Sequence, residues 1–181
     1  MFFSFAGISR ICEFARELLG QTDIYLVEAV NRHYGRARIP LKKFRQWAAV
    51  DDDLVLPEQP QKHDCRIGFS RNLDKGFFSS RTVLYGALQI AYHLGYRRLF
   101  ILGMDLDYRG LNPRFYEASA QMRPSRIERD LEPHILPAFR LVSELCQRGE
   151  LEVYNLSPTS RMPESIIPRL TLEEALALVS T

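Results

Sequence analysis

Residues 99–104 read LFILGM, a continuous apolar run that ends at Asp105. A strand that is apolar on every residue is typical of a parallel sheet covered on both faces. The residues before the run favour a helix, because apolar positions recur at helical spacing and Gly95 follows as a stop: Val83, Leu84, Ala87, Leu88, Ala91 and Leu94. After the run, a second helix is predicted over residues 137–148 and a strand over residues 151–154.

The remaining segments extend this alternation of strands and helices. Residues 23–27 and 65–69 are predicted to be strands, and residues 9–19 an amphipathic helix. Residues 171–174 read TLEE, a capping box that opens a final helix. This order predicts an α/β fold with a Rossmann-like, mainly parallel sheet flanked by helices. A length of 181 residues suits one domain, residues 1–181.

The composition excludes several classes of protein. A hydrophobic fraction of 46% and a charged fraction of 25% are ordinary for a globular domain, so disorder, collagen-like repeats and a disulfide scaffold are excluded. A net charge of +2 argues against a dedicated nucleic-acid binder. Of the 24 basic residues 20 are Arg, which suits carboxylate or phosphate ligands, although a GC-rich genome explains the same bias.

The cysteines and the longest apolar segments bear on location. Cys12, Cys65 and Cys146 lie far apart, and no zinc-binding or C-x-x-C spacing occurs, so we expect a reducing, cytoplasmic environment. No apolar stretch approaches the length of a membrane span. Peripheral contact with a membrane stays open.

Three loops follow the predicted strands of the second half, and they are where a ligand site is expected. In parallel α/β sheets ligands bind beyond the carboxyl ends of the strands. The loops cover residues 70–80, 105–129 and 155–161. The first and third are rich in hydroxyl groups, and the second carries acids, Arg and Tyr.

Two of these loops offer hydroxyl groups to an anionic ligand. Ser79, Ser80, Arg81 and Thr82 run from a loop into a helix start, where backbone N–H groups, hydroxyls and a guanidinium can bind phosphate or carboxylate. The alternative is a plain Ser N-cap, and no Walker lysine is present. Another set follows the strand at residues 151–154 and forms either a second ligand edge or an ordinary loop: Ser157, Thr159 and Ser160.

Two further positions carry chemistry of their own. Asp105 and Asp107 could hold a divalent cation, or Asp105 could cap backbone amides while Asp107 stays solvated. We favour no metal site, with Asp105 still a pocket residue. His134 precedes a predicted helix and is either a general base or an ordinary surface histidine.

Five short segments together resemble a known family. They read GFFSSRTV from residue 76, AYHLGY from 91, ILGMDL from 101, YNLSPTSR from 154 and IIP from 166. In this order and spacing the chain resembles the lipopolysaccharide core biosynthesis proteins regarded as Kdo transferases. More distantly it is similar to the bacterial CMP-sialic acid-dependent sialyltransferases. The resemblance covers about residues 64–170.

The resemblance implies transfer of an acidic keto-sugar from its CMP-activated form to a lipopolysaccharide inner-core acceptor, with no metal or other cofactor. It implies that Tyr108 and Tyr116 steady the departing phosphate and that His134 deprotonates the acceptor hydroxyl, with Glu128 and Glu132 as substitutes. It places residues 79–82 at the donor and residues 157–160 near the nucleotide, with Asp105 and Asp107 in the same pocket.

The resemblance also leaves expectations open. Members begin with a strand and a G-N-G-P-S-like loop, whereas this chain is expected to open with the helix at residues 9–19 and to lack that strand. A catalytically degenerate fragment that binds a saccharide or a partner therefore stays an alternative, as does a Mg²⁺-dependent diphosphokinase of similar fold. The basic stretch at residues 31–45 and residues 109–129 either face a phosphorylated, membrane-bound acceptor or are solvated charge. The oligomeric state is not predicted.

Overall fold

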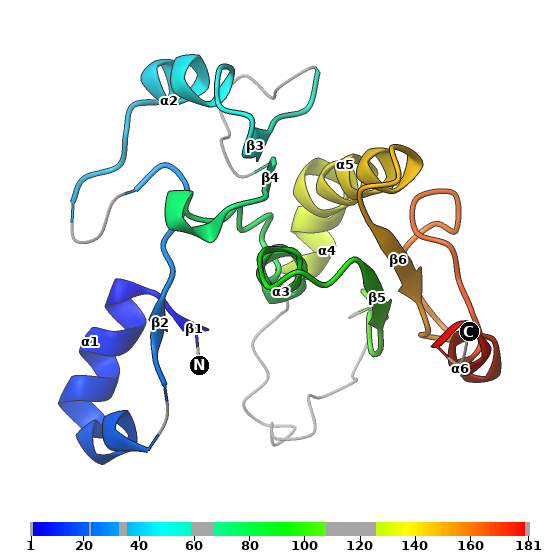
Figure 1. Cartoon of the computed structure of the whole chain (residues 1–181), viewed down its shortest axis with the longest axis horizontal. Coiled ribbons are helices and arrows are strands. Elements are labelled where there is room, and N and C mark those ends of the chain that lie inside the picture. The colour runs from blue at the N-terminus through cyan, green and yellow to red at the C-terminus, as the bar shows by residue number, and fades with distance from the viewer. Residues whose placement is uncertain (1, 22, 33–35, 59–66, 108–125, 180–181) are drawn as a thin grey trace. The chain divides into compact units, whose positions relative to one another are not determined.

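The chain folds as a mixed α/β protein whose elements Figure 1 shows in chain order. The structure is a computed structural model that describes residues 2–21, 23–32, 36–58, 67–107 and 126–179. It divides into two compact units, Met1–Ser79 and Ser80–Thr181. The single domain predicted for residues 1–181 stays a prediction.

The first unit contains short strands and two helices: β1 (Phe2–Phe3), α1 (Phe5–Phe14), a 3-10 turn (Arg16–Gly20), β2 (Tyr25–Leu26), α2 (Leu41–Ala48), β3 (Leu54–Val55), β4 (Phe69–Ser70) and a second 3-10 turn (Leu73–Lys75). β1 pairs with β2 in parallel, and β3 pairs with β4 antiparallel. Beyond β2 the chain makes a parallel bridge between Ala29 and Phe77. The parallel pairing that the sequence predicts therefore occurs here over short stretches.

The start of the chain differs from the prediction. Ser4 caps α1, since its side chain accepts the Gly7 N–H at 3.1 Å, so the helix begins at Phe5 instead of Ser9. It ends before Ala15, which leaves helical geometry, and Phe14 is 77% exposed and so lies on no buried face. β1 precedes the helix, so the expectation that the chain opens with a helix is wrong.

The strands predicted at residues 23–27 and 65–69 form, but they are short. β2 covers Tyr25–Leu26 and β4 covers Phe69–Ser70. Residues 59–66 lie outside the described residues, and Cys65 is among them.

The first unit is anchored by aromatic packing around α2. Phe44 is fully buried and lies with its ring centroid 6.1 Å from that of Phe78 and 5.9 Å from that of Trp47, both in edge-to-face contact. Edge-to-face pairs of this kind add to the stabilisation that burial of the rings provides. Gly76, at φ +93°, allows its segment to lie close to the backbone of Glu28, because a Cβ at residue 76 would lie 2.6 Å from the Glu28 carbonyl oxygen.

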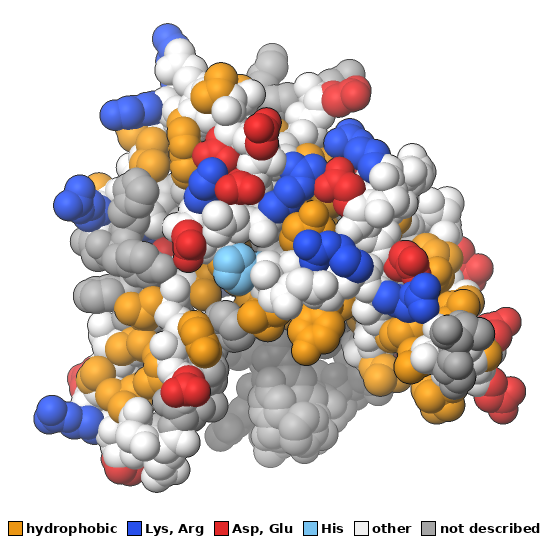
Figure 2. Space-filling view, viewed as in Figure 1, with side chains coloured by type: hydrophobic (Ala, Val, Ile, Leu, Met, Phe, Trp, Pro, Cys, Tyr) orange, Lys and Arg blue, Asp and Glu red, His pale blue; other side chains and the backbone are white. Residues whose placement is uncertain are grey.

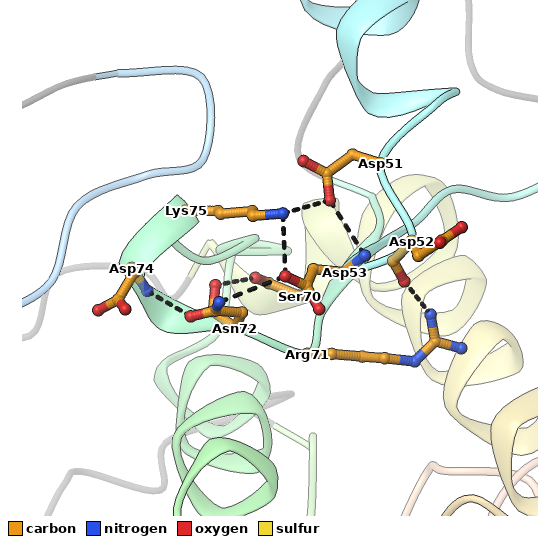
Figure 3. Close-up of polar contacts among 8 residues, drawn as sticks. All are labelled: Asp51, Asp52, Asp53, Ser70, Arg71, Asn72, Asp74 and Lys75. Carbon is orange, nitrogen blue, oxygen red and sulfur yellow. Dashed lines mark hydrogen bonds and ion pairs between the residues drawn. The ribbon is translucent and has the colours of Figure 1, made fainter.

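A network of polar contacts fixes the first part of the loop at residues 70–80 (Figure 3). Lys75 Nζ lies 2.6 Å from a carboxylate oxygen of Asp51 and 2.9 Å from one of Asp53. Asn72 donates to Asp53, and its own side chain accepts the Asp74 N–H at 3.0 Å. The loop is therefore tied at its start to the turn that precedes β3.

The second unit holds the longer elements: α3 (Val83–His93), β5 (Arg98–Ile101), α4 (Ile127–Asp130), a π-helix (Leu131–Ile135), α5 (Leu136–Gln147), β6 (Glu152–Asn155) and α6 (Leu172–Val179). β5 and β6 pair in parallel, from Arg98 opposite Glu152 to Ile101 opposite Asn155. Because the helices from Ile127 to Gln147 connect them, this is a β-α-β unit, as the sequence predicts.

The core of this unit lies along one face of α5. Phe139 is fully buried, and its ring centroid lies 5.6 Å from that of Tyr85 on α3. Burial raises the pKa of the Tyr85 hydroxyl, so this side chain stays neutral. α6 begins with the predicted capping box, in which the Glu174 carboxylate accepts the Thr171 N–H at 2.8 Å and the Thr171 side chain accepts the Glu174 N–H at 3.2 Å.

Candidate functional site

The loops that follow β5 and β6 are joined at the carboxyl ends of these strands. The Ser157 hydroxyl accepts the Met104 N–H at 2.7 Å, and the Ser160 hydroxyl donates to the Met104 carbonyl. Ser157 is buried and Ser160 is half-buried. Two of the hydroxyl groups predicted to contact a ligand therefore hold one loop to the other.

Local side-chain hydrogen bonds shape the loop after β6. Asn155, fully buried at the end of the strand, accepts the Ser157 N–H at 3.0 Å through its side-chain oxygen. Ser160 accepts the Met162 N–H at 3.2 Å. Such contacts to a backbone N–H two residues ahead are what Asn and Ser provide in turns, so the sequence NLSPTS specifies this loop.

Arg161 extends the same assembly to α4. Its N–H donates to the Asp105 carbonyl at 2.8 Å, and its guanidinium lies 2.6 Å from the Glu128 carboxylate. Both side chains are about one-third exposed. Glu128, the predicted substitute for His134 as the base, is thus paired with a cation.

His134 lies on a widened turn of the helix. The Leu136 N–H bonds to the Leu131 carbonyl five residues back, which defines the π-helix. Pro133 and Pro137 have no N–H, so neither can make the regular bond to the carbonyl four residues before it, and the helix widens there. The helix predicted to start at Pro137 consequently begins as far back as Ile127, with His134 inside it.

Asp130 supplies negative charge one turn before His134. It is only 6% exposed, and its carboxylate lies 3.2 Å from Arg129 Nε. Burial acts to raise the pKa of Asp130, but the hydrogen bond and charge of Arg129, with the charges of Arg81 and His134, outweigh it and hold the pKa below its ordinary value. An ionised carboxylate therefore acts electrostatically on both Arg81 and His134.

The backbone of residues 80–82 determines the position of Arg81 at the start of α3. Thr82 caps α3, accepting the Leu84 N–H at 3.3 Å, so the N-cap is Thr82 and not a serine. Ser80 and Arg81 have φ angles of 38° and 63°, which non-glycine residues rarely adopt and which cluster at functional sites. Ser80 is buried and Arg81 exposed, so Arg81 presents its guanidinium to solvent.

The other predicted site residues are less closely tied to this assembly. Asp105, Asp107 and Thr159 are exposed, and Ser79 is half-buried at the end of the first unit. The Asp105 carboxylate caps no amide in the described part of the chain. Tyr108 and Tyr116 lie outside the described residues. Among residues 2–21, 23–32, 36–58, 67–107 and 126–179, no three His, Cys, Asp or Glu side chains gather as a metal site.

Asp130 and Arg161 are functional candidates that the sequence analysis missed. The spacing of Asp130 and His134, four residues apart on one helix, was the available signal. The pairing of Arg161 with Glu128, 33 residues apart, leaves no such signal. Hydrogen bonds therefore link Met104, Asp105 and Glu128 to residues 157–161 at one end of the β5–β6 pair. Asp130 interacts electrostatically with Arg81 and His134.

The sequence was also compared with those of known proteins. A family model described as "3-deoxy-D-manno-octulosonic acid transferase WaaZ" matches residues 17–173. Two curated proteins, each named "Probable 3-deoxy-manno-octulosonic acid transferase", are similar to the chain. The one from Escherichia coli K12 is 31% identical over 135 residues, 75% of this chain and 46% of its own length. The one from Salmonella typhimurium LT2 is 33% identical over 132 residues, 73% and 47% respectively.

The chain spans about half the length of the curated relatives it matches. No solved structure matches it. In the described part of the chain, no helix combines the length and the apolar character needed to cross a membrane. Since the family model covers most of the sequence, this chain belongs to the family of 3-deoxy-D-manno-octulosonic acid (Kdo) transferases that the model describes.

Proposed function

We propose that the chain is part of a glycosyltransferase of lipopolysaccharide core biosynthesis. It transfers a Kdo-like acidic keto-sugar from a CMP-activated donor to an inner-core acceptor. The observation that carries the proposal is the family match over residues 17–173. The proposal includes a Rossmann-like, mainly parallel sheet, which the parallel pairing of β1 with β2 and of β5 with β6 supports.

The donor binds at the carboxyl end of the β5–β6 pair in this proposal. Arg81 is exposed, its charge interacts with that of Asp130, and its planar guanidinium suits a phosphate or the carboxylate of the sugar. Ser157 and Ser160 act indirectly, because their hydroxyls keep the two loops in register. Tyr108 and Tyr116 complete the phosphate site, as the resemblance implies.

The reaction needs a base for the acceptor and a stabilised leaving group. The acceptor oxygen forms a bond to the anomeric carbon while the bond from that carbon to the phosphate oxygen breaks, and CMP leaves with the electron pair. His134 takes the acceptor proton, and the ionised Asp130 carboxylate interacts electrostatically with His134. Attack opposite to the leaving group inverts the configuration of the sugar.

No metal or other cofactor takes part in the proposed step. The leaving group is a monophosphate, whose charge Arg81 and tyrosine hydroxyls can stabilise. We place the protein in the cytoplasm with peripheral contact at the inner membrane, where a lipopolysaccharide acceptor is available.

Binding of CMP to the purified chain tests the proposal directly. Calorimetry is expected to show CMP binding that is unchanged by Mg²⁺ or by a chelator, and weaker binding in Arg81→Gln. Binding that requires Mg²⁺ and favours CTP would instead support the diphosphokinase, and absence of any CMP binding would contradict the transferase proposal.

The role of His134 is tested by kinetics. In an active preparation His134→Ala should lower the rate of transfer by roughly 10²–10⁴-fold, the usual contribution of a general base. His93→Ala is the matched control, because His93 is an exposed histidine at the end of α3. An unchanged rate and pH profile in His134→Ala would show that another group is the base.

A further inference from the structure

One segment of the first unit is strongly basic. Residues 29–50 contain six Lys and Arg and no Asp or Glu, whereas the other residues carry 18 Lys and Arg against 22 Asp and Glu. Five of the six cations are exposed, and together they are called the basic patch: Arg32, Arg36, Arg38, Lys42 and Lys43. Figure 2 shows Lys and Arg side chains projecting over the region of α2.

Within the described residues, no carboxylate neutralises the charge of the basic patch. In the described part of the chain, none of the five side chains forms an ion pair with a carboxylate. Lys75, Arg98 and Arg161 are instead each held against an acidic partner at 2.5–2.9 Å. The cations of the patch are therefore available to a partner outside the chain.

The backbone holds these cations close together. Arg32 and Arg38 form an antiparallel bridge, and Arg32 Nε donates to the Arg36 carbonyl at 3.3 Å, so these three arginines lie close together. Lys42 and Lys43 lie in the first turn of α2, which Phe44 and Ala48 anchor from the buried side. The lysines are thus presented on a fixed helix.

Folding alone does not favour this arrangement. The first turn of α2 has no acidic residue and no side-chain cap, so its lysines face the positive end of the helix dipole. Neighbouring like charges repel as well. An anionic partner would offset this repulsion, and it would explain why these cations gather on an exposed surface.

We propose that the basic patch is the surface with which the chain lies on an anionic lipid bilayer. Polybasic surfaces gain affinity from each cation near acidic headgroups. At the other end of α2, Val50 is 82% exposed and Trp47 half-buried, and these are the side chains that enter the interfacial region of a membrane. These apolar side chains beside the cations favour a lipid surface over a nucleic acid as the partner.

Vesicle sedimentation tests the proposal with the complete chain. The protein should sediment with vesicles of phosphatidylethanolamine and phosphatidylglycerol, less so as salt rises, and not with vesicles of pure phosphatidylcholine. Each neutralised cation is expected to lower the partition coefficient about fivefold, so Lys42→Gln/Lys43→Gln together should lower it about 25-fold. The same variant should unfold at an unchanged or slightly higher temperature, because it removes cations from the start of a helix.

The matched control is Arg140→Gln/Arg148→Gln, which removes the same net charge from exposed positions on and just after α5. It should sediment as the parent does. An equal loss of binding in the control would show that net charge alone determines binding, and it would overturn the assignment to this surface. Undiminished binding in the Lys42/Lys43 variant, or tighter binding to a DNA duplex than to the acidic vesicles, would overturn it too.

Discussion

Replacing Ser157 with alanine removes the hydroxyl oxygen that accepts the Met104 N–H at 2.7 Å. Both residues are 2% exposed, so water cannot take the place of the lost oxygen without the loop opening. Leaving a buried N–H without an acceptor costs about 1–3 kcal/mol. If Ser157 instead formed the ligand edge that the sequence offers as one of two interpretations, the result would be a loss of ligand affinity with little loss of stability.

Hydrogen exchange at the Met104 amide is the direct assay. A cost of about 1–3 kcal/mol corresponds to roughly five- to 150-fold faster exchange of this amide, and urea denaturation should show a loss of the same size. Thr159→Ala, two residues away and exposed, is the control and should lie within about 0.5 kcal/mol of the parent. If Ser157→Ala keeps the parent's exchange and stability but loses CMP affinity, the structural role assigned to this hydroxyl is wrong.

Three further predictions concern stability. The Lys75 hydrogen bond lowers the pKa of Asp53, and the Asp51 and Asp53 carboxylates raise the pKa of Lys75. The stabilisation by these ion pairs should therefore be complete between pH 3.8 and 10.5 and be lost at lower and at higher pH. Urea unfolding followed by Trp47 fluorescence at a series of pH values would measure it. Phe139→Ala should cost about 3–5 kcal/mol in urea unfolding followed by circular dichroism, and a loss below 1 kcal/mol would contradict the packing described. Gly76 has a φ of +93°, and a Cβ there would meet the Glu28 carbonyl oxygen, so Gly76→Ala should lower the free energy of unfolding by about 1–3 kcal/mol in the fluorescence assay. An unchanged free energy of unfolding would contradict this close contact with Glu28.

Hydrophobic periodicity locates the helices and strands of the second unit well but not their ends. The helix at Val83 ends at His93, with Gly95 at φ +95°, as a stop should. The strand predicted over residues 99–104 ends at Ile101, because Leu102 is 73% exposed and Gly103 has a φ of 74°. The pattern of apolar residues does not distinguish a buried side chain from an exposed one, so it could not show where the strand ends.

Long-range contacts explain what the sequence could not predict about the site. The partner of Ser157 is 53 residues away, and that of Arg161 is 33 residues away. Hydroxyl groups in a loop suit a ligand and a neighbouring backbone equally well, so composition cannot separate the two roles. The π-helix is different, since Pro133 and Pro137 are visible in the sequence, although the pattern predicts a helix that starts only at Pro137.

The contacts at the end of the β5–β6 pair divide its polar residues into two groups. In the first group, Ser157 and Ser160 form hydrogen bonds with backbone atoms. In the second group, Asp130 interacts electrostatically with the exposed Arg81 and with His134. Recognition of an anionic donor then depends on the second group, because the Arg81 side chain is exposed in the folded chain. It follows that Arg81→Gln should weaken CMP binding at unchanged stability, and Ser157→Ala should lower stability first. The opposite pattern would exchange the roles of the two groups.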